Sequence, residues 1–105
     1  MLDINVSIAK SGQEQVTLLG LEETLPEGWS FVGLVDGNVP LATVSPGTEG
    51  LLEFGWLAIP AFPVVFRYRL LVPPGTVREQ RISGQVLFKY SGGPSRAERT
   101  PDLVT

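Results

Sequence analysis

Short runs in which apolar and polar residues alternate, separated by turn-forming residues, constrain the fold of this chain more than any other feature. The clearest run is VVFRYRLLV at 64–72, whose alternation puts four apolar side chains on one face and two basic ones on the other: Phe66, Tyr68, Leu70 and Val72 against Arg67 and Arg69. A repeat of two residues is the period of a half-buried β-strand. No helical period is long enough to predict a helix, so we expect an all-β chain.

Seven such runs predict seven short strands, at residues 2–8, 14–24, 29–35, 39–44, 51–59, 64–72 and 81–90. The DGN tripeptide at 36–38 is expected to form a hairpin turn before the fourth strand. Pro40 has no amide hydrogen to donate, so the fourth strand is expected at a sheet edge. Gly84 falls on the apolar face of the last strand, which predicts a bulge or a close backbone approach. Strands of this number and spacing are typical of an immunoglobulin-like antiparallel β-sandwich of about seven strands.

The length of 105 residues is that of a single domain. Residues 1–90 hold all the predicted strands and are expected to form the sandwich. From Ser91 the composition changes to Gly-Gly-Pro and scattered charge, so 91–105 are expected to be a linker or flexible C-terminal tail. No signal peptide and no apolar run of about 18 residues is present, so membrane insertion is not expected. The chain is either a small cytosolic protein or a module of a longer polypeptide, and the isolated domain is expected to be a monomer.

The residue types that carry most enzymatic and metal chemistry are missing, because the sequence contains no cysteine and no histidine. Disulfides, zinc sites, cysteine nucleophiles and histidine bases are therefore excluded. The adjacent acids Glu22 and Glu23 would point to opposite faces of a strand and could not act as a catalytic pair. No calcium loop or phosphate-binding glycine loop is recognisable either. We expect a protein that is not an enzyme and that uses no cofactor or metal.

Charge is distributed unevenly although the net charge is only −3. Residues 1–66 carry eight acids and one base, Lys10, whereas residues 67–105 carry seven bases and three acids. A net charge this small does not predict binding to nucleic acid. The asymmetry would favour end-to-end docking if such modules were joined in tandem.

Four residues are candidates for contact with a partner protein or a sugar: Arg67, Arg69, Trp29 and Trp56. The two tryptophans could stack on carbohydrate rings, but each shares a strand face with a phenylalanine two residues away, so filling the core is the favoured interpretation. The two arginines lie on the outward face of their strand and could bind an acidic partner. The favoured alternative is weak pairing with acids such as Glu53 on a neighbouring strand.

The stretch ETLPEGW at 23–29 marks the point where one alternating run ends and the next begins. It could be a binding loop around an exposed Trp29, or a corner that turns the chain and buries Trp29. The corner is favoured, because Pro26 would end one strand and Gly28 would permit the reversal.

Three stretches of the sequence together resemble the Ig-like repeat modules of archaeal and bacterial secreted and surface-layer proteins. Those modules carry an E-T-L-P-x-G-W-type corner, a later F-x-Y-x-x-x-V-P strand and a closing G-x-V-x-Y strand. The matching residues are Glu23, Thr24, Leu25, Pro26, Gly28 and Trp29; Phe66, Tyr68, Val72 and Pro73; and Gly84, Val86 and either Tyr90, two residues later than the pattern's aromatic, or Phe88 in its place. The resemblance covers about residues 14–92.

The resemblance implies an extracellular or cell-surface location and a non-catalytic structural or interaction module of a larger protein. Such a module would act as a spacer or protein-binding domain, with neighbouring domains of the same polypeptide, another protein or a glycan as its partners. The family supplies no established site residues. A carbohydrate-binding module that uses exposed aromatic rings is the alternative function, and a cytosolic all-β protein acting alone is a third.

Overall fold

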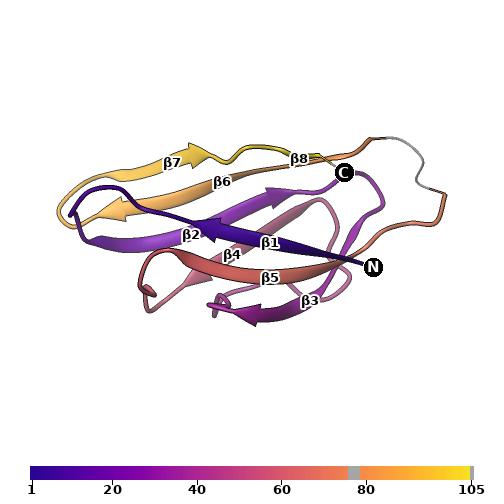
Figure 1. Ribbon diagram of the computed structural model, residues 1–105, viewed down its shortest axis with the longest axis horizontal. Helices are drawn as coiled ribbons and strands as arrows, with labels where there is room; N and C mark the ends of the chain where they lie inside the picture. Colours follow the sequence, from indigo (N-terminus) through magenta and orange to yellow (C-terminus); the bar gives the residue numbers. More distant parts are fainter. Residues whose placement is uncertain (76–78, 105) are drawn as a thin grey trace.

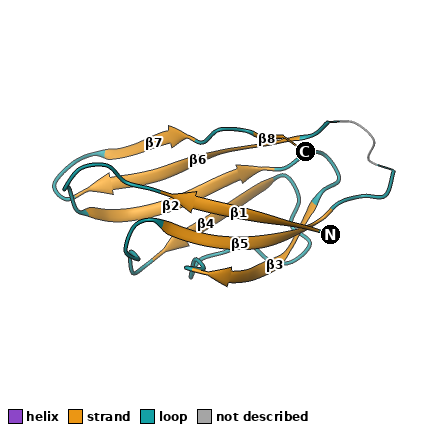
Figure 2. Cartoon of the chain, in the orientation of Figure 1, coloured by secondary structure: helices purple, strands orange, loops and turns teal. Residues whose placement is uncertain are grey.

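The computed structural model describes residues 1–75 and 79–104, and within these residues every regular element is a β-strand (Figures 1 and 2). The strands are β1 (Leu2–Ile8), β2 (Val16–Thr24), β3 (Ser30–Gly37), β4 (Leu51–Trp56), β5 (Val64–Leu71), β6 (Arg81–Tyr90), β7 (Ser95–Arg99) and β8 (Leu103–Val104). The prediction of an all-β chain is confirmed.

The strands form two antiparallel sheets that face each other as a β-sandwich. One sheet has three strands in the order β1-β5-β3, and the other has the order β4-β2-β6-β7, with β8 also paired to β6. Consecutive strands mostly lie in different sheets, so the chain crosses the sandwich repeatedly (Figure 1). The fully paired strand β5 contacts β1 from Leu2↔Leu70 to Ile8↔Val64 without a register shift.

The core lies between the sheets and is built from the inward residues of the alternating runs. β5 shows the pattern most clearly, because four alternate residues on it have no exposed surface: Val64, Phe66, Tyr68 and Leu70. An aromatic cluster occupies the centre, where the ring of Phe54 lies 5.5 Å from that of Phe66 and 5.4 Å from that of Tyr68, measured between centroids. Contacts at such distances add to the apolar burial that holds the sheets together.

The prediction of a fourth strand at residues 39–44 is wrong. These residues form no strand, and their only ladder contact is a bridge in which Ala42 and Gly55 exchange two hydrogen bonds, of 3.0 and 2.9 Å. The DGN tripeptide does not make the predicted hairpin turn, because Asn38 continues the pairing with β5 by donating its N–H to the Val65 carbonyl at 2.7 Å. Gly37 has a φ of +94° and lies so close to β5 that an added Cβ would be 2.8 Å from the Phe66 Cα. The tripeptide therefore extends β3 instead of reversing it.

The predicted linker or tail, 91–105, differs from the structure over its described part. Ser95–Arg99 form β7, which pairs with β6 from Gln85↔Arg99 to Lys89↔Ser95, and β8 pairs with the start of β6. The sequence gives no period here because every residue of β7 is exposed. A strand with neither face buried has no hydrophobic alternation to reveal it.

The corner at 23–29 is confirmed. β2 ends at Thr24, Gly28 has a φ of +83°, and the Trp29 N–H donates to the Pro26 carbonyl at 3.2 Å. A positive φ at the third residue of a four-residue turn is the position that favours glycine. The turn directs Trp29 into the core, where 2% of its surface is exposed.

Candidate functional site

The two candidate tryptophans are both core residues, as favoured by the sequence. Trp29 is 2% exposed and Trp56 is 7% exposed. The Trp56 indole N–H donates to the Asn38 carbonyl at 2.8 Å, and its ring packs edge-on against Phe66. A sugar platform requires an exposed aromatic face, and neither of these rings presents one.

The two candidate arginines lie on the outer face of the three-stranded sheet, where each forms an ion pair with an aspartate on a neighbouring strand. Arg69 on β5 donates from Nε to Asp3 Oδ1 on β1 at 2.7 Å and from Nη2 to Oδ2 at 3.2 Å. Arg67 donates from Nε to Asp36 Oδ1 on β3 at 2.8 Å and makes a second bond to Oδ2. The suggested partner, Glu53, lies on β4 in the other sheet, so that detail of the prediction is wrong.

These pairs stabilise the charged form of all four groups. The hydrogen bond from Arg69 holds the pKa of Asp3 below its usual value, and that from Arg67 does the same for the pKa of Asp36. Because each arginine is already matched by an aspartate, the outer face of this sheet carries little excess positive charge for an acidic partner to bind.

We expect Arg67→Gln or Arg69→Gln to lower the thermal unfolding midpoint only slightly. Exposed pairs contribute little and are screened by salt. The measurement is thermal unfolding of each variant and of the parent chain at low and high salt, in which the small difference should shrink as salt is added. A large decrease that persists in high salt would contradict this view of the pairs.

A carboxyl group lies buried between the sheets on β2. Glu23 is 8% exposed, and burial raises its pKa to about 7. Its side chain occupies space that Gly84, its partner on β6, leaves open, and the Glu22 carbonyl lies 2.7 Å from where a Cβ on Gly84 would be. The predicted close approach at Gly84 is therefore confirmed. Glu22 points the other way and accepts a hydrogen bond from Gln85 Nε2 at 2.6 Å, so the two acids form no pair.

The Tyr68 hydroxyl is buried near this carboxyl and has no hydrogen-bond partner among the described residues. Burial raises the pKa of Tyr68, and the charge of Glu23 raises it further. Two buried polar groups thus lie inside the sandwich close enough for the charge of one to act on the other, and neither forms an ion pair within the described residues.

Replacing Tyr68 by phenylalanine should raise the free energy of unfolding by about 1 kcal/mol. The change removes a buried hydroxyl that has no partner and keeps the ring, and the desolvation penalty of such a group is of this order. Urea unfolding of the variant and the parent chain at the same pH is the measurement. A loss of stability would show that the hydroxyl is hydrogen-bonded in solution.

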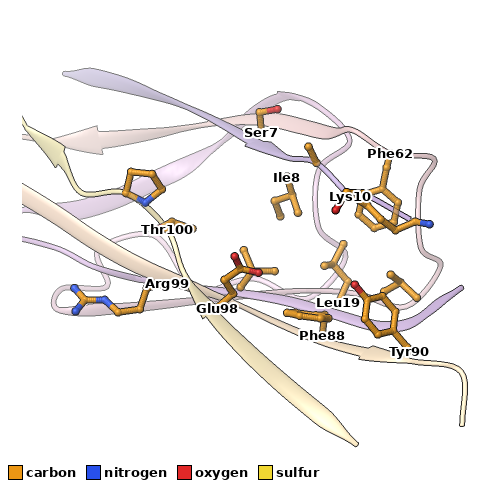
Figure 3. A pocket seen from close by; sticks show the side chains of 15 residues that line it. Ser7, Ile8, Lys10, Leu19, Phe62, Phe88, Tyr90, Glu98, Arg99 and Thr100 are labelled. Carbon is orange, nitrogen blue, oxygen red and sulfur yellow. The ribbon is translucent and has the colours of Figure 1, made fainter. Parts of the chain in front are cut away.

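A groove of about 300 Å³ lies between β1 and the strands β6 and β7 (Figure 3). We call it the edge groove and define its floor as six of the apolar side chains that line it: Ile8, Leu19, Phe62, Val86, Phe88 and Tyr90. Polar groups stand around it, including Ser7 and Glu98, on opposite sides of the cavity in Figure 3. The floor residues on β6 are only partly buried, although they belong to the inner face of the sandwich.

Two cations near the edge groove are engaged with groups of the chain itself. Lys10 donates from Nζ to the carbonyls of Gly12 at 3.1 Å and Glu14 at 2.8 Å. Arg96 on β7 lies over the Tyr90 ring, 5.6 Å from its centroid. A third cation, Arg99, also lines the groove and lies 3.8 Å from Asp102 Oδ1. Glu98 forms no ion pair within the described residues, so it is the charged group at the groove that is open to a partner.

Sequence reasoning missed both Glu23 and the edge groove. Glu23 follows Leu19 and Leu21 at the same parity and precedes Leu25, so its inward direction was visible in the alternation. The groove could not be found in this way, because it depends on how far one sheet extends past the other.

Neither a metal site nor a membrane-spanning helix is found in the part of the chain that is described. Among residues 1–75 and 79–104, no three acidic side chains converge as metal ligands. The same residues contain no helix long and apolar enough to cross a membrane. Comparison of the chain with family models, curated proteins and solved structures finds no match.

Proposed function

We propose that this chain is a non-catalytic structural and interaction module of a larger secreted or cell-surface protein, with an immunoglobulin-like sandwich. It would act as a spacer or a protein-binding domain beside other modules of the same polypeptide. The observation that carries the proposal is the edge groove, which lies beside an unpaired strand edge and has an apolar floor. Such a surface suits contact with another polypeptide better than chemistry on a small substrate.

The positions of the two termini support this proposal. The sandwich measures 48 × 22 × 19 Å, and both termini lie toward the same end of its long axis, on the right in Figure 1. β1 runs away from this end, so its last residues, which line the groove, lie toward the opposite end (Figure 1). A module attached through its termini would hold this part of the groove away from the attachment point.

The proposed extracellular or cell-surface location rests on the resemblance to surface-protein modules. One motif of that resemblance, the corner at 23–29, has a clear structural role in this chain. The E-T-L-P-x-G-W residues form a turn that buries Leu25 and Trp29 and fixes the passage from β2 to β3. A motif with this role would be retained for folding and would leave the loops and edges of each module free to differ.

The proposal is tested by labelling intact cells that produce the parent polypeptide. An antibody raised against the folded module should bind these cells without permeabilisation. Labelling that requires permeabilised cells would contradict the secreted or surface location. The module should also unfold with the same midpoint alone and within the parent polypeptide, whereas unfolding only together with its neighbours would contradict an independent module.

A further inference from the structure

β1 is an unprotected sheet edge. It pairs with β5 on one side and, within the described residues, with no strand on the other. It contains no proline and no register shift, and the side chains on its inner face are all apolar: Leu2, Ile4, Val6 and Ile8. Free edges of this kind present backbone N–H and C=O groups that can pair with another strand.

The other three edges are covered or discouraged from pairing. The edge of β4 is bridged by Ala42. β3 has two register shifts in its pairing with β5, and its free edge exchanges two backbone hydrogen bonds with the turn at 45–48. β7 is short, and its side chains Arg96 and Glu98 lie on the inner face, opposite Phe88 and Val86. Inward charges and short length are devices that block edge pairing. β1 has none of them.

The position next to β1 is also where the sandwich lacks a strand. The sheet that contains β1 has three strands, whereas β6 and β7 extend the facing sheet beyond the edge of β1 (Figure 1). On β6 the only fully buried hydrophobic residue is Ile82, while Val86, Phe88 and Tyr90 are partly exposed. A strand added to β1 would lie above these three side chains and cover them.

We propose that the free edge of β1 binds one extended segment of a partner polypeptide, whose alternate apolar side chains fill the edge groove above β6. This inference rests on the proposed function, because it names the partner of the interaction module and the way in which it binds. Backbone hydrogen bonds to β1 would give affinity, and the groove would select apolar side chains at every second position.

The occupant is a single strand rather than a second folded copy. β6 and β7 project past β1, so a second sandwich approaching edge to edge would meet β7 before its own edge strand reached β1. An isolated extended segment is narrow enough to enter. The free carboxylate of Glu98 lies at the groove, so the segment should also carry a basic residue beside its apolar ones.

The test uses a capped synthetic peptide of about eight residues, the length of an ordinary strand, with alternating valine and threonine and a lysine at each end. Titration into the ¹⁵N-labelled chain is followed by NMR, with hydrogen exchange as a second measurement. We expect saturable shifts at β1 and β6 and slower exchange of the outward-facing β1 amides. Phe88→Asp should weaken binding about tenfold or more, whereas Leu87→Asp, on the opposite face of the same strand, should leave it unchanged.

Two further peptides keep the test independent of variants that fail to fold. One is N-methylated at the valines and the other at the threonines, so that each loses the hydrogen-bond donors on one edge only. Strand addition predicts that one methylated peptide binds about tenfold more weakly or worse and that the other still binds. Equal binding of both would show apolar adsorption and overturn the proposal.

Three other results would also overturn it: no saturable binding by the valine peptide or by its leucine and phenylalanine analogues, a dimer that covers the groove in sedimentation experiments, or groove shifts produced by oligosaccharides in place of peptides. These failures are separate from failure of the proposed function. A chain that labels on intact cells and unfolds independently, yet binds no strand, remains a surface module. A chain that binds the strand but labels only in permeabilised cells is an interaction domain in another compartment.

Discussion

Raising the pH from about 4.5 to about 8 should lower the free energy of unfolding by about 3 kcal/mol through one residue, Glu23. Its pKa is about 7 in the folded chain, because burial disfavours the charged form, and near 4.5 when the chain is unfolded. Between these two values the folded state binds more protons than the unfolded state, so stability falls as the pH rises. Below the lower value both states are protonated, and the penalty disappears.

Glu23→Gln is the variant that isolates this effect. It should be more stable than the parent chain at pH 8 by about the same 3 kcal/mol and nearly equal to it at pH 4.5. Urea unfolding across this range is the measurement, with Glu22→Gln, on the opposite face of β2, as the matched control. If the difference between the Glu23 variant and the parent did not change with pH, the carboxyl would not be buried as described.

The pairs on the outer face act in the opposite direction and at lower pH. The pKa values of Asp3 and Asp36 are lowered by their arginine partners, so the stability that they contribute is present above their usual pKa and is lost as the pH falls through the lowered value. The pH range in which the two aspartates change the stability therefore lies below the range in which Glu23 does. Titration above about pH 5 therefore reports on Glu23 with little contribution from the two aspartates.

Trp29→Ala should reduce the free energy of unfolding by about 3–5 kcal/mol, the range measured when large aromatic core residues are truncated. Trp29 is 2% exposed, and the turn at Pro26 and Gly28 holds its backbone, so the cavity could not close by a small shift. Chemical denaturation is the measurement. Leu57→Ala, at a residue that is 82% exposed, is the control and should change stability very little.

Should Trp29→Ala cost less than about 1 kcal/mol, the corner would not be the structural element described here. A loss equal to the total stability of the chain would leave the variant unfolded in buffer. Trp29→Phe then provides the measurable case, because it removes part of the ring and should cause an intermediate loss. Emission from the remaining Trp56 reports unfolding in either variant.

The strands with one buried face could be predicted from the sequence, and those without one could not. β1 and β5 alternate strictly because the core demands an apolar residue at every second position, and their bounds were predicted almost to the residue. β7 has no buried face, so only pairing with β6 defines it. Residues 39–44 look like a strand in composition, but Gly37 extends β3 and removes the turn that would have formed the hairpin.

The candidate site divides in the same way. The burial of Trp29 and Trp56 followed from their parity, because each shares a strand face with core residues. The aspartate partners of Arg67 and Arg69 could not be predicted in this way, because Asp36 and Asp3 become neighbours of the two arginines only through the strand order of the sheet. The edge groove is a property of two sheets of unequal width, which no local pattern in the sequence encodes.

The pairing of β1 with β5 has a consequence for the order of events during synthesis. Leu2 meets Leu70 and Thr24 meets Ser83, so neither sheet can be completed until most of the chain has left the ribosome. Contacts between residues so distant in sequence slow folding, because a long loop must close before they form. During this interval the apolar face of β1 has no partner, and a nascent chain that stalls before residue 64 would expose a strand well suited to aggregation.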